Sequence, residues 1–259
     1  MTYGELMARE TLSRDQIVTA ALDLLDTDGL EGLNMRALGK RLDSAATAVY
    51  WHVGNKEGLI AMAADRAWAE VELPDPAEVG WRTAAYRMAT SQYAMLTRHP
   101  WLVQAFGSYQ LYGPDKARHD DHSLAVYEAA GFAGAEADQA TSTVFTFVLG
   151  NALGPAAAAS FTRKLGRDGG DVEALMQANR AEIVEVAAQF PRLRARLELP
   201  STEYAAAPDG SFEFGLQAVL DGLEGRLAAR GKPDASSQAQ SDDLREAPKT
   251  IAEANRGVH

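Results

Sequence analysis

Side chains suited to binding DNA phosphates cluster in one short stretch, between residues 33 and 56. Tyr50 and His52 can each hydrogen-bond a phosphate oxygen, a contact that sets position and not sequence. Lys56 falls at the expected start of a helix, where free amide groups and the helix dipole already favour an anion. Arg36 can reach a guanine edge with two hydrogen bonds, or a phosphate. These residue types predict a surface that binds double-stranded DNA.

The helix expected over residues 46–52 carries the candidates for reading the base sequence. Thr47 is the only side chain at its start with a hydroxyl group for a base. Ala46 and Ala48 offer apolar contacts, which suit a thymine methyl group. A short helix presented by a packed scaffold fits the major groove, which is about 12 Å wide.

Capping signals define the helices that would present this surface. The segment 13–16 (SRDQ) fits a capping box that opens a first helix, and Gly29 is suited to closing it. Asn34 can cap a second helix over residues 35–42, and Asn55 can cap a fourth. Because helices this short are unstable alone, the second and third must pack on the first.

Apolar residues at three- and four-residue spacing continue through the rest of the chain, without a strand pattern or an internal repeat. Further helices are expected over residues 81–98, 114–130, 135–162, 172–190 and 211–229. The fold class is therefore all-α. Within the first three helices, Val49 and Trp51 are expected to be core residues.

The stretch from Ser13 to Val71 resembles the TetR family of bacterial transcriptional repressors. The resemblance begins with IVTAALDLLDTDGLEGLNMRALGKRL and culminates in AVYWHVGNKEGLI. A second similarity, FEFGL at residues 212–216 and GLE at 222–224, resembles the last helix of the tetracycline-repressor branch. Two positions depart from the family pattern: Asp43 stands where a glycine with positive φ is usual, and Ala45 where a capping Ser or Thr is usual. Ser44 is the candidate substitute cap.

The resemblance implies a C-terminal domain that binds a small-molecule effector and forms a homodimer through a four-helix bundle. The segments 140–161 and 214–227 are the candidate bundle helices, and intramolecular core packing is the alternative. The drug- and metal-contacting positions of tetracycline repressors fall near Glu72, Met88 and Phe106. Because phenylalanine replaces the metal-binding histidine, we expect an effector other than tetracycline with magnesium.

Aromatic and amide side chains in the middle of the chain are candidates for an effector pocket, with plain core packing as the alternative. These residues are Met88, Gln92, Phe106, Tyr109, Tyr112, Phe145 and Asn151. The motif HDDH at residues 119–122 could bind a metal, but we expect it to be an exposed helical face. We expect no metal, no cofactor and no catalytic residues, because no arrangement typical of catalysis stands out.

The bulk composition is that of a folded, acidic protein. Of 259 residues, 46% are apolar, which is enough for a core; the net charge is −11, and there is no cysteine. An acidic body argues against general nucleic-acid affinity, but the segment 32–57 has a local excess of positive charge. Residues 140–162 carry no charge, yet a buried core or interface helix is favoured over a membrane span. No signal peptide is expected, which favours the cytoplasm.

The sequence thus predicts a flexible arm (1–12), a helix-turn-helix domain (13–58), an effector-binding and dimerisation domain (59–230) and a disordered tail (231–259). The predicted function is a homodimeric repressor that binds a palindromic operator and is released by a small, largely apolar effector. The alternative is an all-α enzyme or small-molecule carrier with a vestigial DNA-binding domain.

Overall fold

The computed structural model describes residues 12–167, 171–198 and 210–230, and these residues form helices and no strand. The prediction of an all-α fold is therefore confirmed. The predicted arm, apart from residue 12, and the predicted tail lie outside the described residues. The chain divides into two compact units, Met1–Leu220 and Asp221–His259, which are considered separately.

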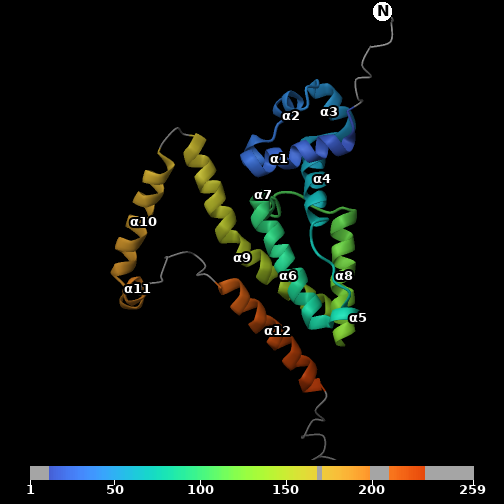
Figure 1. The fold of residues 1–259 in the computed structure, drawn as a ribbon, viewed down its shortest axis with the longest axis vertical. Helices are drawn as coiled ribbons and strands as arrows, with labels where there is room; N and C mark the ends of the chain where they lie inside the picture. Colours follow the sequence, from blue (N-terminus) through green and yellow to red (C-terminus); the bar gives the residue numbers. More distant parts are fainter. Residues whose placement is uncertain (1–11, 168–170, 199–209, 231–259) are drawn as a thin grey trace, which may run out of the picture. The chain divides into compact units, whose positions relative to one another are not determined.

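The first four helices follow the caps seen in the sequence (Figure 1). They are α1 (Arg14–Gly32), α2 (Met35–Arg41), α3 (Ala46–Val53) and α4 (Lys56–Trp68). Ser13 and Gln16 form the predicted capping box of α1. Asn34 and Asn55 cap α2 and α4 by accepting the backbone N–H groups of Ala37 and Gly58. Gly29 has φ 72° and a non-helical backbone, so it ends the regular helix as predicted, and a short further turn follows this kink within α1.

Eight more helices complete the described chain. They are α5 (Pro76–Val79), α6 (Trp81–Arg98), α7 (Pro100–Ala105), α8 (Pro114–Ala130), α9 (Ala135–Arg167), α10 (Val172–Ala188), α11 (Pro191–Leu197) and α12 (Ser211–Arg230). The short helices α5 and α11 were not predicted. Helix α9 runs through Pro155 without a break.

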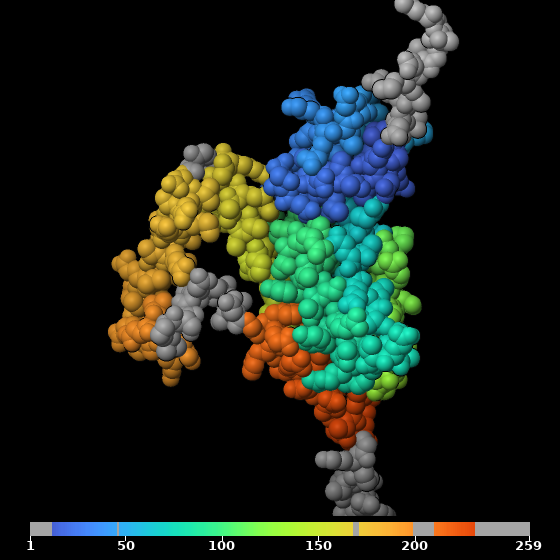
Figure 2. All heavy atoms as spheres, in the orientation of Figure 1, coloured from blue at the N-terminus to red at the C-terminus, as the bar shows by residue number. Residues whose placement is uncertain are grey.

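The core of the first unit lies where α6, α7 and α8 pack against α9. Trp101, Leu96 and Leu102 are fully buried there. Figure 2 shows that side chains fill the spaces that the ribbon leaves between α6, α7 and α8. Above them, α1 packs on α4 and α7, and α4 also packs on α8 and α6. Helix α4 therefore belongs to both the N-terminal helices and the body.

Helix α9 is long and apolar enough to cross a membrane by length and composition. Its buried residues instead follow one stripe at four-residue spacing: Ala140, Val144, Val148, Ala152 and Ala156. This stripe packs on α6, α7 and α8, as in a core helix of a helical protein. The remaining faces of α9 include the exposed side chains of Leu153 and Phe161.

A buried histidine joins α1, α7 and the segment after α4. His99 Nδ1 lies 2.7 Å from Asp26 Oδ1, and His99 Nε2 lies 3.1 Å from Glu70 Oε1. Trp101 Nε1 donates a second hydrogen bond to Asp26 Oδ1, at 2.9 Å. Because both ring nitrogens face carboxylates, which only accept, the imidazole is held in its doubly protonated form. Burial alone would lower the pKa of His99, but hydrogen bonds and charge from Asp26 and Glu70 outweigh it, so the pKa is raised.

We predict that His99→Gln removes part of the pH dependence of stability. A raised pKa in the folded state gives stability that is complete below the unfolded value of 6.5 and is lost as pH rises through the folded pKa. The free energy of unfolding of the wild type, from urea titrations at several pH values, should therefore exceed that of His99→Gln most at low pH. If the free energies of unfolding of the wild type and His99→Gln ran parallel at all pH values from about 6 upward, this role of His99 would be contradicted.

Candidate functional site

Helix α3 presents an exposed face made of the residues that the sequence singled out. Tyr50 is 47% exposed, and Thr47 is also exposed. Val49 is fully buried, as predicted, and fixes which side of α3 faces the protein. Trp51 is 84% exposed, so its predicted place in the core is wrong. Since Trp51 is two residues from Val49, it projects from the opposite side of the helix.

The remaining predicted contacts differ in exposure. Ala48 and His52 are half-buried at the border of this face, and Arg36 on α2 is exposed. Ala46 is the first residue of α3, and its side chain lies outside the described part of the chain.

Lys56 bonds to α1 within the group of helices α1 to α4. Its ammonium group donates a 2.9 Å hydrogen bond to the carbonyl oxygen of Leu30, at the end of α1. An ammonium group has three N–H donors, so two remain for other partners. The residue predicted as a phosphate contact therefore also fixes the start of α4 against α1.

The turn between α2 and α3 has the strained geometry that its sequence indicated. Asp43 has φ 47° and is the one non-glycine residue with positive φ in the described segments. Ala45 is the N-cap of α3 and makes no side-chain capping bond, so the suggested substitution by Ser44 is wrong. Helix α3 thus lacks a side-chain cap, which typically costs about 1 kcal/mol.

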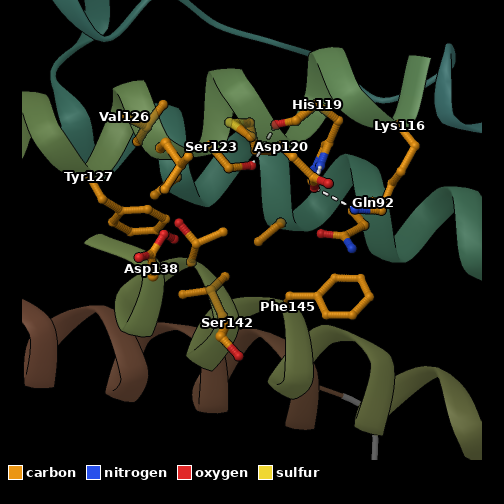
Figure 3. Close-up of a pocket in the computed structure, with 16 residues that line it drawn as sticks. Gln92, Lys116, His119, Asp120, Ser123, Val126, Tyr127, Asp138, Ser142 and Phe145 are labelled. Carbon is orange, nitrogen blue, oxygen red and sulfur yellow. Dashed lines mark hydrogen bonds and ion pairs between the residues drawn. The ribbon is translucent and has the colours of Figure 1, made fainter. Parts of the chain in front are cut away.

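A cavity of about 320 Å³ lies between α6, α8 and α9 (Figure 3). Its walls are largely apolar, with Met88, Val126, Tyr127 and Phe145 among the lining residues. In Figure 3, Gln92 lies beside Lys116 and near Phe145, whereas Tyr127 and Asp138 lie at the other end. The volume and composition are those of a small-molecule site.

Three of the seven predicted pocket residues line this cavity, namely Met88, Gln92 and Phe145. Phe106 lies outside the lining, with its ring 5.9 Å from that of Phe145. Tyr109, Tyr112 and Asn151 are also outside the lining; Tyr112 is 63% exposed, and Asn151 bonds the carbonyl oxygen of Phe147. The seven candidates therefore divide into three that line this cavity and four that do not.

One face of α8 supplies polar lining residues that were not predicted. Lys116, His119 and Ser123 line the cavity together with Asp120. His119 is only 5% exposed, so the expectation that the HDDH motif is an exposed face is wrong for this residue. The signal was present in the sequence, because His119, Ser123 and Tyr127 recur at four-residue spacing.

Charges in the cavity are largely neutralised within α8. Lys116 Nζ pairs with Asp120 and lies 4.8 Å from the ring centroid of Trp68. His119 Nδ1 lies 3.4 Å from Asp120 Oδ1. Burial, and then the nearby charge of Lys116, lower the pKa of His119 against the opposing effect of Asp120. The pKa of Asp120 is lowered despite its burial, because His119 and Lys116 hydrogen-bond to it. At neutral pH the cavity therefore contains a neutral imidazole beside an ion pair.

The cavity also collects buried polar atoms that have no partner. Among the described residues, such side-chain atoms are Trp68 Nε1, Gln92 Nε2, His119 Nε2 and Thr141 Oγ1. The last three belong to residues that line the cavity. An unpartnered buried polar group costs about 1–3 kcal/mol, so their concentration here indicates a site shaped for a ligand. In the same segments, no group of three or more His, Asp or Glu side chains could hold a metal ion.

A contact between α4 and α8 links the cavity to the N-terminal helices. Helix α8 begins with Gly113-Pro114, which offers no side-chain cap. Asp65 of α4 caps α8 instead, because its Oδ1 accepts a hydrogen bond from the backbone N–H of Lys116 at 2.9 Å. A Cβ atom at Gly113 would overlap the carboxylate of Asp65. The glycine therefore allows α4 to approach close enough to cap α8.

Comparison with known families agrees with the helix-turn-helix at one end of the chain and the cavity further along. The profile described as "Bacterial regulatory proteins, tetR family" matches residues 17–63, and "Tetracyclin repressor-like, C-terminal domain" matches residues 73–227. The chain belongs to the TetR family. Proteins of this family are transcriptional regulators that bind DNA and respond to ligands, which does not favour the enzyme or carrier alternative.

Known transcriptional regulators resemble this chain over half or more of its length. The transcriptional repressor DrrR1 of Streptomyces coeruleorubidus is 30% identical over 86% of this chain and 81% of its own. An HTH-type transcriptional regulator of Saccharopolyspora erythraea is 35% identical, but the match covers only 54% of this chain and 59% of that protein. The solved structure of Streptomyces coelicolor ActR in complex with actinorhodin has a TM-score of 0.63 and 27% identity, covering 85% and 99% of the two chains.

We predict that Gln92→Leu leaves the free energy of unfolding unchanged or raises it by about 1 kcal/mol, since it removes an unpartnered buried amide. The matched control is Gln16→Leu, whose amide oxygen accepts the N–H of Ser13 in the capping box. That change should lower the free energy of unfolding by about 0.5–1 kcal/mol. Urea titration of both variants checks this; a clear loss of stability in Gln92→Leu would mean that its amide is bonded in the folded protein.

Proposed function

We propose that this TetR-family regulator is a cytoplasmic, homodimeric repressor. It binds a palindromic operator and is released by a small, largely apolar effector other than tetracycline. The proposal assigns DNA binding to residues 13–58 and effector binding and dimerisation to residues 59–230, with an arm (1–12) and a tail (231–259) outside them. The observation that carries the proposal is that one chain contains both an exposed face on α3 and an apolar cavity, and that α4 connects the helices around them.

The exposed face of α3 supports the DNA-binding part. Tyr50, Thr47 and Trp51 project away from the protein, while Val49 anchors the opposite side. Arg36, exposed on α2, adds positive charge to the same unit. Phosphate contacts from such groups would position the helix, and Thr47 would then contribute to base recognition.

The cavity supports the effector part. It is largely apolar and carries a few convergent polar groups, the usual pattern of a ligand site. ActR, a structural relative, has been solved in complex with actinorhodin, a compound other than tetracycline. By the sequence resemblance, Phe106 falls near the position of the metal-binding histidine of tetracycline repressors, and its hydrocarbon ring offers no lone pair to a metal.

Exposed apolar side chains support the homodimer. Leu153 and Phe161 on α9 are 57% and 40% exposed, and Phe214 at the start of α12 is 80% exposed. A single chain leaves these large apolar groups in water, whereas a second copy packed on them would bury them. A two-fold dimer would present two α3 helices to half-sites about one DNA turn apart.

The Asp65 cap supports the link between the two activities. An effector that contacts His119 or Lys116 acts on the first two turns of α8. Because Asp65 bonds the amide of Lys116, a shift of α8 would be passed to α4 and then to α1. A displacement of a few Å would take two recognition helices out of register with their grooves.

We predict that Arg36→Gln and Thr47→Ala affect DNA binding in different ways. Duplexes selected from a random pool should form a palindrome. On that palindrome Arg36→Gln should weaken binding and reduce the salt slope by about one, since one phosphate contact is lost. Thr47→Ala should instead change the base preferred at one position of each half-site. The charge-matched control is Arg192→Gln on α11, which should bind as the wild type does; no enrichment of any duplex at low salt would refute the proposal.

We also predict that Asp65→Ala separates DNA binding from the effector response. The variant should bind the selected palindrome within about threefold of the wild type, because Asp65 lies away from α3. It should need a higher effector concentration for release, because α8 has lost the cap that ties it to α4. Asp65→Asn keeps an acceptor oxygen and serves as the control. An unaltered response in Asp65→Ala, measured by fluorescence anisotropy of labelled DNA, would exclude this route.

A further inference from the structure

Two residues at one end of the cavity carry unpartnered polar atoms with different bonding needs (Figure 3). Gln92 Nε2, on α6, and His119 Nε2, on α8, are both buried and have no hydrogen-bond partner. The residues are 3% and 5% exposed. Gln92 Nε2 belongs to a donor group, so it requires an acceptor from a ligand.

The neighbour of His119 determines what the imidazole requires. Asp120 Oδ1 lies 3.4 Å from His119 Nδ1, and a carboxylate bonded to Lys116 can only accept. The proton of the neutral ring therefore resides on Nδ1, which leaves a lone pair on Nε2. A ligand must bring a donor, such as a hydroxyl group, to this nitrogen.

The charges around the cavity oppose an anionic ligand. Lys116 is the cation of the lining, and it is paired with Asp120 and covered by the Trp68 ring. Asp138 adds a second carboxylate to the lining. A carboxylate or phosphate on the effector would meet this net negative charge without a free cation to pair with.

The rest of the lining favours a flat aromatic ligand. Phe145 lies near Gln92, and Tyr127 lies at the far end of the cavity (Figure 3). Met88 adds a polarizable thioether, which suits aromatic partners. Flat rings can stack against such side chains and still direct oxygen atoms at their edge to one wall.

We propose that the effector is an uncharged planar aromatic compound that carries a phenolic hydroxyl and a carbonyl group on one edge. The hydroxyl donates to His119 Nε2, and the carbonyl oxygen accepts from Gln92 Nε2. This inference rests on the proposed function and specifies the chemical class that its effector site recognises. The hydroxyl contact makes the site select phenols over their methyl ethers.

The test uses a panel of defined probes and the full-length protein. The probes are xanthone, its four monohydroxy isomers and the corresponding monomethoxy isomers, titrated by quenching of tryptophan fluorescence and by calorimetry. At least one hydroxyxanthone should bind about tenfold more tightly than both its methyl ether and xanthone. In His119→Phe, which keeps a ring on Trp68, this preference should disappear, and Gln92→Leu should weaken all carbonyl-bearing probes alike.

The matched control is Asp121→Asn, an exposed neighbour on α8 outside the lining. It should retain the wild-type preference. Equal affinity of the wild type for phenols and methyl ethers would overturn the inference, as would the absence of binding by every probe. Because the wild-type comparison needs no variant, misfolding of His119→Phe would not obscure the answer. Operator selection without probes is done in parallel, so a failure to bind DNA would count against the proposed function and not against the ligand class.

Discussion

The cap that Asp65 places on α8 is the constraint on which the arrangement of the body depends. Helix α8 opens with Gly113-Pro114, so its own first residues cannot satisfy the free amides of its first turn. Asp65 does so from α4, and the absence of a side chain at Gly113 lets the two helices meet. A second tie lies just past the same, C-terminal end of α4, where Glu70 bonds His99 and Arg98. The C-terminal part of α4 and the segment after it are therefore fixed to α8 and to the buried cluster that also holds α1.

The cavity shows a conflict between stability and binding that a simple core would not contain. Its walls come from α6, α8 and α9, the helices that form the core of the first unit. Core positions normally pair every polar atom, yet three unpaired ones are brought together here. Leucine or valine would fill such positions at lower cost. A ligand that completed the missing bonds would offset the cost of leaving these atoms unpaired.

Local signals in the sequence were sufficient for much of the fold and less so for the site. Ser13, Asn34 and Asn55 act on amides three residues away, so the helix starts that they cap could be predicted from neighbours alone. Trp51 and His119 were misplaced because their burial depends on which helix face meets the body, a property of tertiary packing. The large apolar ring of Trp51 suggested burial, and the polar neighbours of His119 suggested exposure, and both indications were wrong. Likewise, Asp65 caps a helix that begins about fifty residues later in the chain, and no spacing rule connects them.

The tie between α4 and α8 runs through a main-chain group. Asp65 bonds the backbone N–H of Lys116, which every residue except proline possesses. Position 116 and the rest of the α8 wall can therefore exchange side chains without breaking the tie. The chemistry of the wall and the connection to α4 are therefore separable in this chain. A designer who wants a sensor for a new compound can do the same, provided that Asp65 and Gly113 are left untouched.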